Sequence, residues 1–254
     1  MRVALIVPNK DGRRWLPGML ASVRAQSRAA DRVVVVDDGS RDDSVAWLRS
    51  EGVEVLERGA SGGFAAAVNA GWRFVGADCD AIALVNTDVE LAPDWLERTT
   101  AALAADDGAA AVACKMVGMD DAGLIDDAGD ILRRDGVCEQ RGHGRRDDGR
   151  WDAPGEVFAA CAGAALYRRA AVLAAGGFDE RLFASEEIAL SKGLAKHGRF
   201  IILRERVLTS GRKLRTHSGW DVLKVLAHLV SSGGSVLRSR DRLSIWYGAR
   251  RDDV

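Results

Sequence analysis

Runs of consecutive apolar residues dominate the first half of the chain, and two of them end on carboxylates. The run over residues 33–36 precedes Asp37, and the run over residues 82–85 precedes Asp88. Four or more apolar residues in a row, closed by a polar turn, are typical of strands buried on both faces of a parallel sheet. Because ligands bind at the carboxyl ends of such strands, we expect the two acidic ends to share one cleft. Such a cleft suits a nucleotide with a divalent cation, so the pattern indicates an enzyme.

Predicted strands and helices alternate through the first 116 residues. The pattern predicts strands over 2–8, 32–37, 53–56, 81–86 and 109–116, and helices over 13–25, 42–49, 64–75 and 93–105. We expect the Ser40 hydroxyl to cap the second helix, and Pro93 to stand in the first turn of the fourth. Strands separated by helices of this length imply right-handed crossovers. The sequence therefore predicts an α/β fold, Rossmann-like, with a mainly parallel sheet flanked by helices.

The alternation stops after Met116. Residues 118–154 are rich in Asp, Gly and Arg and predict loops with room for a hairpin, and an irregular segment of this length is usually functional or mobile. Further on, the pattern predicts helices over 169–175 and 186–196 and short strands over 200–203 and 206–208. An amphipathic stretch over 220–230 and a basic end follow. We therefore divide the chain into a domain over 1–218 and a helical, basic tail over 219–254.

Charge is distributed unevenly, although the net charge is only −1. Residues 1–191 hold 22 Lys and Arg against 32 Asp and Glu, whereas residues 192–251 hold 14 against 3. A basic C-terminal quarter suggests contact with something anionic. A diphosphate, an anionic membrane surface and the acidic body of the protein are all open as that partner, as is a plain solvated face.

Cysteine spacing and hydropathy indicate a cytoplasmic protein. The four cysteines lie far apart without the spacing of a metal site, which is typical of a reducing compartment. No apolar run approaches the roughly 18 residues of a spanning helix, and the start of the chain is too short for a signal peptide. The amphipathic stretch over 220–230 leaves three placements open: on the domain, against a second copy in a homodimer, or peripherally on the inner face of the cell membrane.

The acidic strand ends carry the candidate chemistry. Asp88 follows Asn86 at the end of a buried strand, and Mg²⁺ or Mn²⁺ is often held by one or two carboxylates together with substrate phosphates. Asp37 ends the neighbouring predicted strand, where its carboxylate could accept the imide N–H of a uracil or thymine base. Taken alone, either carboxylate could instead close a turn or cap a helix.

Six segments carry recognisable motifs in a fixed order. They are VALIVPNKDG, VVVVDDGSRDDS, SGGFAAAVNAG, LVNTDVEL, AGAALYRRAAVLAAGGFDERLF and EEIALS. Through them, the chain from about residue 4 to residue 217 resembles glycosyltransferase family 2, the large inverting family with the GT-A (nucleotide-diphospho-sugar transferase) fold. The stretch TSGRKLRTH over 209–217 is similar to a segment in a rhamnosyltransferase-like branch of that family.

The resemblance implies a set of residues for the nucleotide sugar. These are Pro8, Asn9, Asp37, Asp38, Asn69, Asn86, Gly163 and Arg212. Asp37 would contact the base, and Asn69 would help to shape the sugar-nucleotide pocket. Gly163 and Ala164 would let the backbone approach the donor sugar, although small residues there could equally serve packing. Arg212 suits bidentate recognition of phosphate.

The resemblance also implies a metal site and a catalytic base. Asp88 would hold a divalent cation, Mg²⁺ or Mn²⁺, against the diphosphate, and His217 would be an additional ligand because other members place a His after the last core strand. Glu187 stands where the family has its catalytic Asp and would take the proton of the acceptor hydroxyl. Glu186 and Glu187 could equally favour the positive end of a helix.

These implications describe a metal-dependent inverting transferase of a hexosyl or deoxyhexosyl unit. The donor would be a UDP-, dTDP- or GDP-linked sugar, and the acceptor a glycan or lipid-linked saccharide of bacterial cell-envelope polysaccharide biosynthesis. Asn86 and Glu187 both depart from the commoner Asp of the family, which keeps open a nucleotide-sugar-binding protein without transfer activity. A dehydrogenase is disfavoured because residues 8–12 lack a G-x-G-x-x-G. No nucleic-acid-binding module is recognisable.

Overall fold

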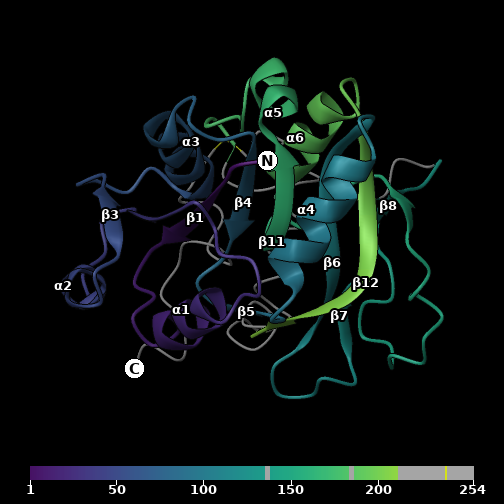
Figure 1. Ribbon diagram of the computed structural model, residues 1–254, viewed down its shortest axis with the longest axis horizontal. Coiled ribbons are helices and arrows are strands. Elements are labelled where there is room, and N and C mark those ends of the chain that lie inside the picture. Colours follow the sequence, from purple (N-terminus) through teal and green to yellow (C-terminus); the bar gives the residue numbers. More distant parts are fainter. Residues whose placement is uncertain (135–137, 183–185, 211–237, 239–254) are drawn as a thin grey trace.

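A computed structural model describes residues 1–134, 138–182 and 186–210, together with residue 238. In this part of the chain, helices cover both faces of a ten-stranded sheet (Figure 1). The helices are α1 (Leu16–Arg24), α2 (Ser44–Ser50), α3 (Phe64–Val75), α4 (Trp95–Ala105), α5 (Arg169–Ala175) and α6 (Glu186–Leu194). The strands are β1 (Val3–Asn9), β2 (Arg32–Asp37), β3 (Glu54–Glu57), β4 (Ala81–Val85), β5 (Val89–Leu91), β6 (Ala109–Gly118), β7 (Ile125–Asp127), β8 (Asp130–Leu132), β9 (Cys138–Gln140), β10 (Gly155–Val157), β11 (Ala164–Arg168) and β12 (Arg199–Thr209).

The sheet has a parallel half and a mixed half. β3, β2, β1 and β4 lie side by side and run parallel, as the alternation of strands and helices predicted. β11 then runs antiparallel between β4 and β6, and β12 lies parallel to β6. No helix separates β6 from β11 in the described chain, and without a helical crossover the chain can return in the opposite direction. The short strands β5, β7 and β10 pair antiparallel at this half, and β8 with β9 forms a separate hairpin.

Alternate residues of the strands face two separate cores. Ile6 and Val36 lie in the core under α3, α5 and α6, whereas Leu5 and Val35 lie in the core under α1, α2 and α4. All four are fully buried. Burying a Val, Leu or Ile side chain stabilises a fold by about 1.5–3 kcal/mol, so strands that are apolar on both sides fix a three-layer arrangement.

Two predicted helix starts were wrong. Ser40 does not cap α2, because that helix begins at Ser44 and the Ser40 hydroxyl donates to Asp37 instead. The N-cap residue is Asp43, which makes no capping hydrogen bond with its side chain, and Asp42 just before it accepts the Ser44 N–H at 3.0 Å with its Oδ1. α4 begins at Trp95, so Pro93 precedes the helix rather than standing in its first turn.

The last core strand is one element, not the two short strands that the sequence predicted. β12 is continuous from Arg199 to Thr209, and its register against β6 shifts between Leu203 and Arg206. An irregularity of this kind interrupts the apolar alternation and makes one strand look like two.

Residues 118–154 contain the hairpin that the sequence left room for. Lys115 at the base of this segment is completely buried and pairs with Asp147 at 2.8 Å and with Asp152. Arg206 of β12 reaches the same Asp147 at 2.8 Å. A buried ammonium group is tolerated only when it is paired, so these contacts fasten the segment to β6 and β12.

The four cysteines form no disulfide. None of the described helices is long and apolar enough to cross a membrane. The proposed boundary at residue 218, the amphipathic stretch over 220–230 and nearly all of the basic tail lie outside the described residues.

Candidate active site

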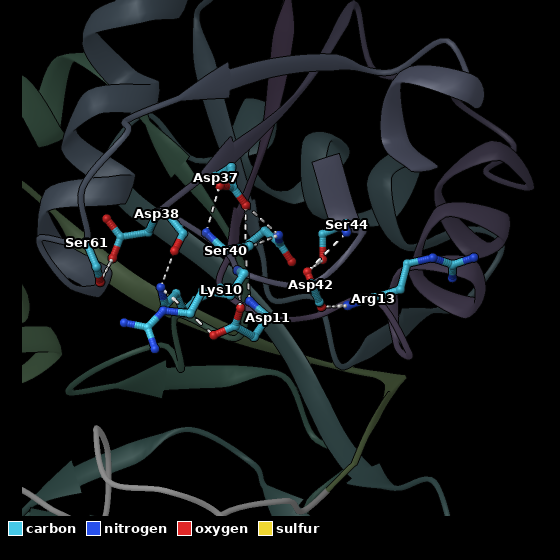
Figure 2. Close-up of polar contacts among 12 residues, drawn as sticks. Lys10, Asp11, Arg13, Asp37, Asp38, Ser40, Asp42, Ser44 and Ser61 are labelled. Atoms are coloured by element: carbon cyan, nitrogen blue, oxygen red, sulfur yellow. Dashed lines mark hydrogen bonds and ion pairs between the residues drawn. The ribbon is translucent and has the colours of Figure 1, made fainter. Parts of the chain in front are cut away.

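Side chains at the ends of β1 and β2 form one hydrogen-bonded cluster (Figure 2). Asn9 stands opposite Asp37 in the strand register, and its Nδ2 donates to Asp37 Oδ1 at 2.9 Å. The Ser40 hydroxyl donates to Asp37 Oδ1 at 2.5 Å, and the Ser40 N–H donates to Oδ2 at 3.0 Å. Asp37 and Asn9 are 3% and 1% exposed. Asp37 is therefore held in one orientation, and its Oδ2 accepts a single hydrogen bond from the described chain.

Asp38 fastens the loop before α3 to the end of β2. Its Oδ1 accepts the Gly62 N–H at 2.9 Å and a bond from Arg58, and its Oδ2 accepts the Gly63 N–H at 2.9 Å and the Ser61 hydroxyl at 2.6 Å. Gly63 has φ +88°, which a residue with a side chain rarely adopts. Asp38 thus has four hydrogen bonds on two oxygens. We refer to Asn9, Asp37, Asp38 and Ser40 as the β1–β2 edge.

Gly12 connects the β1–β2 edge to the end of β4. A Cβ on Gly12 would lie 2.4 Å from Asn9 Oδ1 and 3.3 Å from the Thr87 Oγ1, so only glycine permits this approach. Asn9 Oδ1 is buried and has no hydrogen-bond partner in the part of the chain that the structure describes. Since β1 also pairs in parallel with β4, Asn9 and the Asn86–Thr87–Asp88 turn lie at the same edge of the sheet; that Asp37 and Asp88 share one cleft stays a prediction.

The end of β4 is held from two sides. The Asn86 N–H donates to the Gly163 carbonyl at 2.8 Å, which brings together two residues predicted for the nucleotide sugar. Asp88 is half-buried; its carbonyl accepts the Ser210 N–H at 3.1 Å, and its Oδ2 accepts the Ser210 hydroxyl at 2.7 Å. A Cβ on Gly163 would lie 3.1 Å from the Met116 methyl carbon, so the glycine is also needed for packing.

The residues around Asp88 fit a hard cation that is completed by substrate. Among the described residues, no group of three or more His, Cys, Asp or Glu side chains could hold a metal ion by itself. Mg²⁺ and Mn²⁺ are often bound by one or two carboxylates and by substrate phosphates, for which Asp88 suffices on the protein side. His217, the second predicted ligand, lies outside the described residues, as does Arg212.

Asn69 points its amide at a loop of the protein. It is 7% exposed in the middle of α3, and its Oδ1 accepts the Phe178 N–H at 3.0 Å. Its Nδ2 donates to the Phe178 carbonyl at 2.8 Å and to Glu180 Oε1 at 2.9 Å. Pro8, by contrast, lies half-buried beside Asn9 in β1, and Ala164 opens β11 fully buried against Val85.

Glu187 lies half-buried in the first turn of α6, close enough to β7 and β8 for its charge to act on them. Burial raises the pKa of Asp127 to about 6, and the charges of Asp126 and Glu187 add to the effect, although the Gly129 N–H and the Gln140 amide oppose it. Burial likewise raises the pKa of Asp130 to about 7, together with the charges of Asp127 and Glu187. We refer to Asp127, Asp130 and Glu187 as the acidic cluster.

The sequence prediction missed Asp127 and Asp130. Asp127 is 2% exposed, and Asp130 Oδ1 is buried without a hydrogen-bond partner in the described chain. The signal in the sequence was weak. Asp127 and Asp130 stand on either side of Ala128 and Gly129, shortly after the buried Ile125, in a segment whose composition otherwise indicates an exposed loop. Neither residue belongs to a motif that is typical of an acidic site, and only the fold brings Glu187 close enough for its charge to act on them.

Comparison with solved structures supports the fold. GalNAc-T7, crystallised with UDP, GalNAc and Mn²⁺, superimposes with a TM-score of 0.67 at 14% identity, over 82% of this chain and 44% of that one. TarS 1-349 of S. aureus has a TM-score of 0.63 at 15% identity, with 97% and 70% covered. The mannosyltransferase PcManGT of Pyrobaculum calidifontis, in complex with GDP-Man and Mn²⁺, has a TM-score of 0.62 at 20% identity, with 94% and 64% covered. The chain thus spans less than two thirds of the first and third of these proteins, and it shares the GT-A fold with all three.

A search of curated proteins by sequence found no match. The family model described as glycosyl transferase family 2, however, matches residues 4–174, about two thirds of the chain. This match begins in β1 and includes the β1–β2 edge, the Asn86–Thr87–Asp88 turn and β11. The chain therefore belongs to glycosyl transferase family 2.

Proposed function

We propose that this glycosyltransferase moves a hexosyl or deoxyhexosyl unit from a nucleoside diphosphate to a hydroxyl, with inversion at the anomeric carbon. The observation that carries the proposal is that β2, which ends at Asp37, and β4, which Asp88 follows, both lie parallel beside β1, so that the two carboxylates stand at the same end of the sheet. A nucleotide sugar carries a base and a metal-binding diphosphate in one molecule, so the carboxylates that bind these two parts must line the same site. In an open α/β sheet, this edge is where such a ligand binds.

On the donor side, Asp37 is proposed to accept the imide N–H of a uracil or thymine base at Oδ2, which accepts only the Ser40 N–H from the described chain. Asp38, whose two oxygens already accept four hydrogen bonds, would shape this pocket through the loop that it holds. Pro8, Asn9, Asn86 and Gly163 complete the proposed donor site. Arg212 is proposed to bind phosphate.

Asp88 is proposed to hold Mg²⁺ or Mn²⁺, with His217 as a second ligand. Bound there, the cation would neutralise charge on the leaving nucleoside diphosphate. Two structural neighbours support this part of the proposal, because GalNAc-T7 was crystallised with UDP, GalNAc and Mn²⁺, and PcManGT is in complex with GDP-Man and Mn²⁺.

On the acceptor side, Glu187 is proposed to take the proton of the attacking hydroxyl as its oxygen bonds to the anomeric carbon and the bond to the diphosphate breaks. Glu187 is half-buried in the first turn of α6, and a positioned carboxylate is one of the groups that can accept a proton in such a step. Glu187 also lies close enough to Asp127 and Asp130 for its charge to raise the pKa values of both carboxyl groups.

The wider assignment follows from the resemblance of the sequence. We propose a rhamnosyltransferase-like enzyme with a catalytic domain over 1–218 and a basic tail over 219–254. It would act in the bacterial cytoplasm, at the inner face of the membrane, on a cell-envelope glycan or a lipid-linked saccharide, and not on nucleic acid. A screen of UDP-, dTDP- and GDP-sugars tests the donor, and flotation with anionic liposomes tests the tail.

The central experiment compares donor consumption by the wild type, Glu187→Gln and Glu186→Gln in the presence of Mn²⁺. If Glu187 is the base, Glu187→Gln should lower kcat by about 10²–10⁴-fold and leave donor affinity, measured by calorimetry, unchanged. If both carboxylates merely favour the positive end of α6, the two variants should behave alike. A folded wild type that binds no nucleoside diphosphate with Mn²⁺ would sink the proposal.

A second candidate is a nucleotide-sugar-binding protein without transfer activity. The observation that favours it is the presence of Asn86 and Glu187 where the family commonly has Asp. Binding of a nucleoside diphosphate without turnover of any donor in the panel would support this candidate over the enzyme.

A further inference from the structure

Asn69 is an unusual residue for its place in the molecule. Asn is a poor helix former, and a buried amide costs free energy unless it is fully hydrogen-bonded. In α3, Asn69 uses both its N–H groups and its oxygen on a loop that lies 109 residues further along the chain. It binds the N–H and the carbonyl of the same residue, Phe178, as a neighbouring β-strand would. The Asn69 side chain therefore holds the backbone of Phe178 in place.

The backbone around Gly177 and Phe178 allows this close contact. Gly177 has φ +75°, and a Cβ there would lie 2.8 Å from Asn69 Oδ1. The Phe178 ring is 3% exposed. It packs edge-on against Phe64, with 5.6 Å between the ring centroids, and at a tilt against Trp72, with 5.5 Å between the centroids. Both aromatic partners belong to α3. The loop thus docks on α3 through its backbone and its largest side chain.

The start of α3 is attached to the β1–β2 edge. Asp38 accepts the N–H groups of Gly62 and Gly63, which directly precede α3. Phe178 also belongs to the core that buries one face of α6, because it lies in the same cluster of buried residues as Leu190 and Leu194 of that helix. α3 is therefore joined to the end of β2 through Asp38, and to the core beneath the helix that carries Glu187 through Phe178.

We propose that Asn69 is a positioning residue: by clamping Phe178 onto α3, it fixes where Glu187 stands relative to the β1–β2 edge. The proposal rests on the function proposed above, in which Glu187 is the base and Asp37 contacts the donor. It gives Asn69 a role different from shaping the nucleotide pocket. A displacement of about 1 Å between reacting groups can cost about 100-fold in rate, so a clamp of this kind matters to catalysis.

The test measures kcat, KM for the donor and the pH profile of kcat for Asn69→Ala and Asn69→Asp. Asn69→Ala should lower kcat by about 10- to 100-fold, leave donor affinity within about twofold, and shift the acidic limb of the pH profile. Asn69→Asp should be at least as impaired, because its carboxylate would face the Phe178 carbonyl and the Glu180 carboxylate.

Gln26 offers a matched control. It is 9% exposed, its Nε2 donates to the Ala92 carbonyl at 2.7 Å, and its Oε1 accepts the Leu96 N–H at 2.9 Å. It thus ties the chain after α1 to the start of α4 as Asn69 ties α3 to the loop. Gln26→Ala should lower the melting temperature much as Asn69→Ala does, and yet leave kcat and its pH profile unchanged.

The outcomes separate the proposal from the proposed function. If the wild type is active and Asn69→Ala loses only stability, as Gln26→Ala does, the clamp is structural and the proposal is overturned. If Asn69→Ala raises the donor Kd while kcat is unchanged, Asn69 acts on the nucleotide pocket, which also overturns it. A wild type without turnover on any donor overturns the proposed function, and the positioning role with it.

Discussion

Asp37 and Asp38 at the β1–β2 edge are 3% and 4% exposed, and Asp127 in the acidic cluster is 2% exposed, so two parts of the molecule bury carboxylates. Their surroundings differ. The two carboxylates of the β1–β2 edge accept hydrogen bonds from backbone N–H groups, from Asn9, from an arginine and from serines. In the acidic cluster, Asp127 and Asp130 lie near one another and near Glu187, and burial and like charge raise the pKa values of both Asp127 and Asp130.

The difference indicates two kinds of task. Carboxylates that are held by several hydrogen bonds are fixed in position, which suits recognition of a rigid ligand. Carboxylates that repel one another in a buried site change protonation near neutral pH, which suits the handling of protons. The proposed division of labour between the donor side and the base side therefore has a physical counterpart in how each group of carboxylates is stabilised.

Asp38→Ala tests the β1–β2 edge and should have the largest effect on stability. It leaves two backbone N–H groups and the Arg58 guanidinium without their acceptor. We expect the free energy of unfolding to fall by about 3–5 kcal/mol, measured by urea denaturation. Asp94→Asn is the control, because Asp94 pairs with Arg98 in an exposed i,i+4 contact, and losing this contact should change the free energy of unfolding far less. Equal effects of the two variants would mean that the β1–β2 edge is not preorganised.

The β1–β2 edge was largely predictable from the sequence. The apolar runs before Asp37 and Asp88 identify buried strands, and strand ends in an α/β sheet meet at one edge. Ser40 shows where local rules failed. It was expected to cap a helix, but Asp37 lies three residues before it and accepts both its N–H and its hydroxyl. The competing turn prevailed, and α2 begins four residues later.

The acidic cluster could not be predicted, because it is assembled by contacts between residues that lie far apart in sequence. Asp127 and Asp130 precede Glu187 by more than fifty residues, and no periodic pattern connects an irregular segment to the first turn of α6. Asn69 illustrates the same limit. The sequence placed it correctly in a helix, but its partner, Phe178, could be found only from the fold.

Asp127→Asn tests the acidic cluster through the pH dependence of stability. The pKa of Asp127 is raised from 3.8 to about 6 in the folded state, so the folded protein binds this proton more tightly than the unfolded chain does. Stability is then fully present below about pH 4 and is lost as pH rises through about 6. The raised pKa corresponds to at most about 3 kcal/mol. Relative to the wild type, Asp127→Asn should therefore be about 2 kcal/mol more stable at pH 8 than at pH 4.

Asp179→Asn provides a comparison of opposite sign. Hydrogen bonds from the Arg181 side chain and N–H lower the pKa of Asp179 to about 2, so its stabilising effect is present at neutral pH and is lost as the pH falls through about 2. Denaturation of both variants at several pH values would distinguish the two directions. If Asp127→Asn showed no pH-dependent gain, the acidic cluster would be ordinary surface charge and the contrast with the β1–β2 edge would disappear.

Ser210→Ala tests the surroundings of Asp88, which differ from those of both other groups of carboxylates. Asp88 is half-buried, and its Oδ2 accepts the Ser210 hydroxyl. Losing this hydrogen bond should cost about 1 kcal/mol of stability. If Asp88 holds the metal, the hydroxyl also orients a ligand, and Mn²⁺ affinity in the presence of a nucleoside diphosphate should fall by about tenfold. Ser22→Ala removes a comparable hydroxyl, bonded at 2.7 Å to the Met19 carbonyl in α1, and should leave Mn²⁺ affinity unchanged. Equal Mn²⁺ affinity in the two variants would place the metal away from Asp88. Asp88 would then serve only to hold Ser210, and the β1–β2 edge would have no metal-binding carboxylate beside it.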